Sequence, residues 1–175
     1  MPVVCWSQTK GPELNQGDLL PGIPVPLFRL PIRDEMQIEG DVETVTEIVV
    51  RDAIIVSHTC DLLQDKIRLV ALCPVLTITD YEEQQPRFAK EWKNVQKGRH
   101  EGLHLLGPSN ESGDHKKALV VDFREIISLP RGYVERHASD CDNRYRLASP
   151  FLEHFSQCFG RFYMRVALPE FISLP

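Results

Sequence analysis

A run of polar side chains able to do chemistry lies between Ser57 and Asp61, directly after the apolar run Ala53–Val56. The end of a strand can hold polar side chains toward solvent on a rigid backbone, which suits a functional site. His58 and Cys60 could form a Cys–His nucleophile, because an imidazole can lower the pKa of a nearby thiol and a carboxylate such as Asp61 can orient the ring. This corner therefore suggests a Cys-dependent enzyme.

A simpler interpretation of the same corner stays open. On an extended chain His58 and Cys60 point to one face, whereas Ser57 and Asp61 point to the other, which does not favour a literal triad. In this alternative Cys60 is a small buried hydrophobe, and Asp61 or Ser57 caps the turn through bonds to backbone amides.

A metal site is a further possibility for part of this corner. His58, Cys60 and Cys73 could converge if the strands that carry them pair. Structural zinc sites usually show paired Cys or His residues at close spacing. His100 and His104 have the His spacing, but no Cys pair accompanies them and they lie in an expected loop. We therefore expect no metal and no other cofactor.

The last third of the chain is rich in arginine and contains no lysine after residue 117. Arginine binds phosphate in a bidentate manner and stacks on bases, so an arginine patch with tyrosines between its members would suit single-stranded RNA. Alternatively, these arginines neutralise the acidic first half of the chain across an internal or dimer interface. The residues that we expect to contact RNA or a partner are Arg124, Arg131, Arg144 and Arg146.

The two halves of the chain differ in charge. Residues 1–85 carry 6 basic and 14 acidic side chains, residues 86–175 carry 14 basic and 11 acidic ones, and the net charge is −5. A pI near 5.7 excludes a chain-wide electrostatic grip on nucleic acid. No apolar run approaches the ~20 residues that cross a bilayer, and the N-terminus shows no secretory signal. We therefore expect a cytoplasmic protein without membrane contacts, whose five cysteines are reduced.

The scaffold for these side chains is expected to be rich in β-structure. A length of 175 residues fits a single domain. Residues 1–40 are rich in proline, which predicts an arm across the surface with a first short strand, not a central strand. Residues 41–175 are expected to form a β-barrel-like domain, because short β-branched runs there predict strands. These runs are residues 42–50, 53–56, 67–72, 103–106, 118–123, 126–129 and 145–147.

Two helices complete the expected fold. The spacing of apolar residues predicts a short inserted helix over residues 87–97. A second helix should begin at Ser149-Pro150, with the serine as its cap, and end before Pro169. Its apolar stripe is typical of core packing and comprises Leu152, Phe155, Phe159, Phe162 and Val166. The expected class is α+β: a partly open SH3-like β-barrel with an inserted short helix and a C-terminal helix.

The order of these elements resembles that of the PemK/MazF toxin family. The matching features, in order, are Gly17-Asp18, Arg51 before a strand that ends in Ser57, Cys73 to Thr77, Val120 to Arg124, and the helix after Pro150. The resemblance covers residues 15–168 as a loose match of elements. It implies an SH3-like barrel and an endoribonuclease that cleaves single-stranded RNA. Arg51 and Thr77 would then help to transfer protons and to stabilise the phosphate as the ribose 2′-hydroxyl attacks.

A second resemblance concerns the Ser-x-Thr-Cys-Asp string at residues 57–61 and the tail at residues 159–169. Both are similar to uncharacterised small bacterial proteins found with mobile elements and defence clusters. We therefore expect a binding module of a bacterial toxin–antitoxin or phage-defence assembly that contacts a protein partner or RNA, with a homodimer as a further possibility. The alternatives are the endoribonuclease with Arg51 and Thr77, and the enzyme with Cys60, His58 and Asp61.

Overall fold

The computed structural model describes residues 5–29, 45–107 and 118–164. Every pairing between its strands is antiparallel, and helices flank the sheet, so the α+β class is confirmed. The strands are β1 (Trp6–Thr9), β2 (Asp18–Arg29), β3 (Val45–Ile55), β4 (Leu69–Thr77), β5 (Leu103–Leu106), β6 (Leu119–Asp122), β7 (Ile127–Pro130) and β8 (Arg144–Leu147). The helices are α1 (Thr59–Leu63), α2 (Ile78–Gln84), the 3-10 helix η2 (Pro86–Lys90), α3 (Trp92–Gln96), α4 (Arg131–Asp140) and α5 (Phe151–Tyr163).

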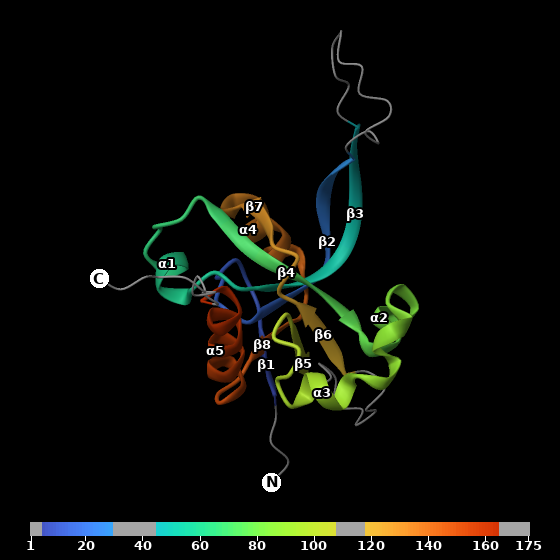
Figure 1. Cartoon of the computed structure of the whole chain (residues 1–175). Helices are drawn as coiled ribbons and strands as arrows, with labels where there is room; N and C mark the ends of the chain where they lie inside the picture. The colour runs from blue at the N-terminus through green and yellow to red at the C-terminus, as the bar shows by residue number, and fades with distance from the viewer. Residues whose placement is uncertain (1–4, 30–44, 108–117, 165–175) are drawn as a thin grey trace, which may run out of the picture.

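The strand order in the sheet is β1-β8-β2-β3-β4-β6-β5, and the sheet is not closed (Figure 1). Strand β4 is the centre of this arrangement. It pairs with β3 along one edge, and its other edge is shared by β6 and β7. The expected continuation of the strand at residues 118–123 into residues 126–129 is confirmed, because β7 resumes beside β4 where β6 stops. Residues 122–126 stand opposite residues 73–74, so the chain bulges outward between the two strands.

Both faces of the sheet are buried. On one face lie Leu20, Ile23, Ala53, Ile55, Val70 and Leu72, with Val134 and Ala138 of α4 packed against them. On the other face lie Leu19, Ile54, Cys73, Val75 and Val121, with Phe155 of α5. Consecutive residues of β3 thus enter opposite cores, which explains why residues 53–56 form an unbroken apolar run.

The Pro-rich segment contains a strand, as expected, but the strand is longer than the short one predicted, and Leu20, Ile23 and Val25 in it are buried. Strand β2 runs from residue 18 to residue 29 inside the sheet, and with β3 it extends from the body as a two-stranded ribbon (Figure 1). Its prolines are tolerated because β8 pairs only with Asp18 and Leu19, so the rest of that edge needs no backbone donors. The carbonyl group of Pro24 accepts a bond of 2.8 Å from the Tyr133 hydroxyl, away from β3.

The expected helix over residues 87–97 is present as two short pieces, η2 and α3, and α2 precedes them without having been expected. Helix α4 was also missed. The C-terminal helix is confirmed as α5, and Phe155, Phe159 and Phe162 of its stripe pack in the second core. Ser149 does not cap it, because the cap position is Pro150, which has no side-chain bond to offer. Val166 and Pro169 lie outside the described residues. No described helix combines the length and apolarity needed to cross a membrane.

Candidate functional site

The Ser-His-Thr-Cys-Asp corner lies on the surface at the start of α1. His58 is the N-cap of this helix, and its Nδ1 accepts a hydrogen bond of 3.3 Å from the Cys60 backbone amide. Ser57 accepts one of 2.8 Å from the backbone amide of Ala71 in β4. Cys60 is exposed, so the interpretation of this thiol as a buried hydrophobe was wrong. The cap comes from His58, not from Asp61 or Ser57.

The corner does not assemble a Cys–His pair by itself. The His58 ring nitrogen that faces Cys60 is bonded to its backbone and not to its thiol. Asp61 lies in the first turn of α1, where a carboxylate suits the helix dipole. Cys73 is fully buried in β4, and within the described residues it does not meet His58 and Cys60 as a group of metal ligands. The Cys-dependent enzyme stays a prediction.

All four expected contact arginines are paired with carboxylates of the chain, and three of them lie outside the pocket described below. Arg144 is fully buried and lies 2.8 Å from Asp18, which also pairs with Arg146. Arg131 pairs with Asp65 and with Glu135. Asp18 and Asp65 belong to the acidic first half, so the internal-interface alternative describes these three arginines. Their contact with RNA or a partner stays a prediction.

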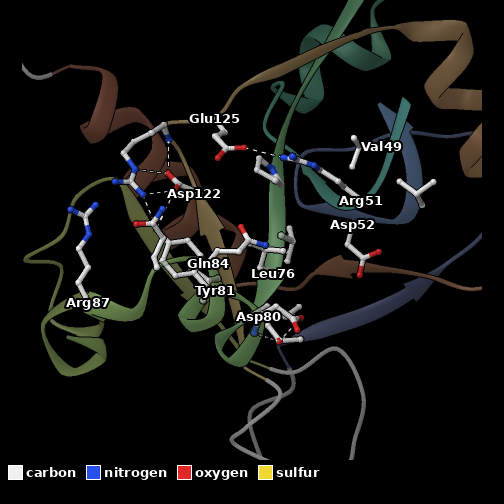
Figure 2. A pocket seen from close by; sticks show the side chains of 18 residues that line it. Val49, Arg51, Asp52, Leu76, Asp80, Tyr81, Gln84, Arg87, Asp122 and Glu125 are labelled. Carbon is white, nitrogen blue, oxygen red and sulfur yellow. Dashed lines mark hydrogen bonds and ion pairs between the residues drawn. The ribbon is translucent and has the colours of Figure 1, made fainter. Parts of the chain in front are cut away.

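The fourth, Arg124, shares a pocket with Arg51 and Thr77. This pocket of about 620 Å³ lies where β3, β4, β6 and α2 meet, and Figure 2 shows its lining. It also receives polar side chains from α2 and from the bulge between β6 and β7. The polar residues that line it are Arg51, Asp52, Thr77, Asp80, Tyr81, Gln84, Gln85, Arg87, Asp122, Arg124 and Glu125. Two residues chosen from the sequence for RNA cleavage are thus brought together, while His58, Cys60 and Asp61 are absent from the pocket.

Arg51 and Glu125 form the accessible charged pair of the pocket. Arg51 Nη1 lies 3.1 Å from Glu125 Oε2, and their side chains are 32% and 58% exposed. In Figure 2 Arg51 points from β3 toward Glu125 on the bulge, while Asp80 lies at the opposite end. An ion pair this exposed contributes about 0–1 kcal/mol, so a ligand anion can compete for the guanidinium group.

A tighter network lies on the inner wall. Asp122 accepts from Arg124 through both oxygens, with a distance of 2.7 Å between Nε and Oδ1, and Arg124 Nη2 donates to the Tyr81 hydroxyl at 2.7 Å. The hydrogen bond from Asp122 raises the pKa of the Arg124 guanidinium. Burial raises the pKa of the Tyr81 phenol, and the nearby Asp122 charge raises it further. Asp122 and Arg124 are therefore held together as a charged pair beside the Arg51–Glu125 pair, with the Arg124 side chain 44% exposed.

Thr77 ends β4 and begins α2. Its hydroxyl donates to the Asp80 carboxylate at 2.6 Å and accepts from the Asp80 backbone amide at 3.1 Å. This is a helix cap, and the Thr-x-x-Asp spacing at residues 77–80 is the signal that could have predicted α2. Two site residues were missed. No local pattern marks the bulge that carries Glu125, and Tyr81 lies on α2, a helix that was not expected.

Comparisons with known proteins identify no relative. No family model, no curated protein and no solved structure matches the chain. The resemblance to the PemK/MazF family accordingly stays a prediction, and the geometry of the pocket carries the functional argument.

Proposed function

We propose that this chain binds single-stranded RNA in the pocket of Arg51 and Thr77, and that it promotes cleavage of that RNA. The observation that carries the proposal is the convergence of these two residues, from β3 and from the end of β4, on one pocket of about 620 Å³. Pockets of this size are typical of sites for small ligands or for part of a chain.

The Arg51–Glu125 pair supplies a general base and a positive charge, the two functions that RNA cleavage needs first. Glu125 accepts the proton of the ribose 2′-hydroxyl, whose oxygen then attacks the adjacent phosphorus. Arg51 stabilises the negative charge that builds up on the non-bridging oxygens. The bond from phosphorus to the 5′-oxygen breaks and that oxygen takes a proton from water. The hydroxide left behind takes the proton from Glu125, so the carboxylate is restored and the products are a 2′,3′-cyclic phosphate and a 5′-hydroxyl. Thr77 lies at the other end of the pocket, and it can donate to the same strand when its hydroxyl turns from the Asp80 carboxylate to a phosphate oxygen.

The distribution of charge supports this division of roles. Asp122 holds Arg124 in two hydrogen bonds, so Arg124 is poorly available to a phosphate. Arg51 has one exposed carboxylate partner, and a phosphate can replace it. The SH3-like barrel that the toxin resemblance implies belongs to the same proposal. It is supported by two irregularities that bend the sheet, one in β2 between Leu20 and Ile23 and one between β6 and β7. We also propose a cytoplasmic location, since all five cysteines are free thiols and RNA is abundant there.

A second candidate function is that of a binding module without catalysis, acting in a toxin–antitoxin or phage-defence assembly. The observation that favours it is the presence of four carboxylates in the pocket: Asp52, Asp80, Asp122 and Glu125. Carboxylates weaken the attraction for phosphate and suit a basic segment of a protein partner better.

The test is incubation of the purified chain with end-labelled single-stranded RNA and with DNA of the same sequence. We expect cleavage of RNA only, with cyclic-phosphate ends, and a loss of about 100-fold or more in Arg51→Ala. Thr77→Val should weaken RNA binding and Thr77→Ser should restore it. The matched control is Arg136→Ala, which removes an exposed arginine of α4 outside the pocket. RNA bound but not cleaved supports the second candidate; an equal loss in Arg51→Ala and Arg136→Ala contradicts the pocket as the site.

A further inference from the structure

A second cluster of chemically active side chains lies between β5 and α5, next to the core that contains Phe123 and Phe155. His104 of β5, His154 of α5 and Cys158 of α5 place their ligand atoms within 4.8 Å of one another. None of these residues lines the Arg51 pocket, so the cluster is independent of the proposed function.

Each of the three side chains is held by its element. His154 and Cys158 are one helical turn apart on α5, on the same face, with 3.7 Å between Nε2 and Sγ. His104 is 7% exposed, and its ring packs against Phe123 and Phe155 and lies 5.2 Å from the ring of His154. No side-chain hydrogen bond to the His104 ring occurs among the residues that the structure describes. Within the described part of the chain the His104 ring is therefore not held by a hydrogen-bond partner, and it lines the same cavity as His154 and Cys158.

The three groups are near the spacing of a transition-metal site, since the His154–Cys158 pair is 3.7 Å apart and no pair of ligand atoms is more than 4.8 Å apart. With Zn–N near 2.0–2.1 Å and Zn–S near 2.3 Å, tetrahedral geometry puts ligand atoms about 3.5 Å apart, close to the spacing found on α5. Two imidazoles and one thiolate form a borderline-soft ligand set that suits Zn²⁺ better than the hard cations Mg²⁺ and Ca²⁺. We propose that His104, His154 and Cys158 bind one Zn²⁺ ion.

Zinc binds an imidazole through a ring-nitrogen lone pair and a cysteine as its thiolate, so Zn²⁺ must displace the proton of the Cys158 thiol. Binding of one Zn²⁺ therefore releases that proton to solvent, while the two imidazoles coordinate through ring nitrogens.

The fourth coordination position is open. The cluster lies on a cavity of about 390 Å³ that is also lined by Cys5, His100 and Arg161. A site with three protein ligands and an accessible cavity leaves room for water or a ligand on the metal. The sequence predicts no metal here because spacing rules search for neighbouring ligands, whereas His104 reaches this site from a strand distant along the chain.

The test is metal titration of the full-length chain after removal of metal with a chelator. We expect one Zn²⁺ per chain by competition with a chromogenic chelator, and one Co²⁺ with the ultraviolet charge-transfer band of a thiolate ligand. Cys158→Ser and His154→Gln should each lower the affinity by about 10- to 100-fold or more, since even outer-shell partners have effects of that size. Cys158→Ser should also abolish the charge-transfer band.

The matched controls are Cys60→Ser and His58→Gln, which alter an exposed thiol and imidazole on the surface corner at α1. Circular dichroism of each variant without metal keeps a loss of binding distinct from a loss of folding. Absence of stoichiometric binding by the wild-type chain overturns the proposal. So does unchanged affinity in folded Cys158→Ser and His154→Gln, or an equal loss in the two controls.

Discussion

Arg144 and Asp18 form a completely buried ion pair, with Nη1 of the arginine 2.8 Å from Oδ2 of the aspartate. Arg146, two residues further along β8, donates to the same carboxylate. Arg144 Nη2 also donates to the carbonyl oxygens of Gly11 and Glu13, at 2.6 and 3.0 Å. One carboxylate at the start of β2 thus holds two guanidinium groups and, through Arg144, the segment that precedes β2.

Asp18→Asn should destabilise the fold strongly. Removing one charge of a buried pair leaves an uncompensated guanidinium group and costs about 3–5 kcal/mol of unfolding free energy. The control is Asp65→Asn, whose side chain is 83% exposed in its pair with Arg131 and whose loss should cost about 1 kcal/mol or less. Urea unfolding followed by circular dichroism measures both. Similar small losses in the two variants would show that the Asp18 network is not structural.

Gly17→Ala should also be destabilising. Gly17 has φ +83°, and an added Cβ would lie 2.8 Å from Leu152 Cδ1 of α5 and 3.1 Å from Leu147 Cβ. The left-handed backbone alone costs about 1–2 kcal/mol with a side chain. Gly132→Ala is the matched control, because its Cβ in α4 meets nothing within 4 Å and alanine favours helix by up to about 1 kcal/mol. We expect the melting temperature to fall in the first variant and not in the second; the reverse order would contradict this packing of α5.

Tyr81 should make the fold less stable at alkaline pH. Its raised pKa, caused first by burial and then by Asp122, means that the folded chain keeps the phenol proton at a pH where the unfolded chain has lost it. Stability therefore falls as pH rises above about 10, the ordinary tyrosine pKa. Tyr81→Phe should show a shallower alkaline decline in urea unfolding than the wild type. Tyr133→Phe, on the exposed side of α4, is the control, and parallel profiles for the wild type and Tyr81→Phe would contradict the assignment.

The cysteines of the corner and of β4 should differ in reactivity. Cys60 is exposed, whereas Cys73 is fully buried, and burial raises the pKa of the Cys73 thiol to about 12. Iodoacetamide should modify Cys60 in the native chain and reach Cys73 only after unfolding, as read by peptide mass spectrometry. Cys60→Ser should lack the early modification. Equal rates at the two thiols in the native chain would contradict the position of β4.

The strands were largely predictable from the sequence, because β-branched runs such as Ala53–Val56 mark them directly. The burial of both faces of the sheet was not predictable, because the run Ala53–Val56 does not show which helices cover each face. Helix α4 escaped notice because Val134 and Ala138 are its only buried residues among the described ones, too few to form a stripe. The length of β2 was not predicted, because prolines argue against a strand that is paired along both edges. The sequence does not show that β8 pairs only with Asp18 and Leu19, which leaves the edge beside the prolines unpaired.

The candidate site could be predicted in part. Arg51 and Thr77 were chosen through a family resemblance and do line one pocket. Glu125 and Tyr81 were not chosen, since they reach the pocket from a bulge and from a helix whose positions depend on strand pairing across β4. Arg144 and Arg146 were expected either to contact RNA or a partner or to neutralise the acidic first half, and both bind Asp18 of that half. The composition of the two halves indicated such pairing, but it could not identify the carboxylate.

The most direct test of the RNA site is a crystal structure of the chain with a short RNA whose ribose at the cleavage position carries a 2′-deoxy substitution, which prevents attack. The account predicts a phosphate in the pocket, with the Arg51 guanidinium turned from Glu125 to its oxygens and Glu125 facing the 2′-position. RNA bound on another face, with Arg51 still paired to Glu125 at the distance of 3.1 Å seen without RNA, would contradict it.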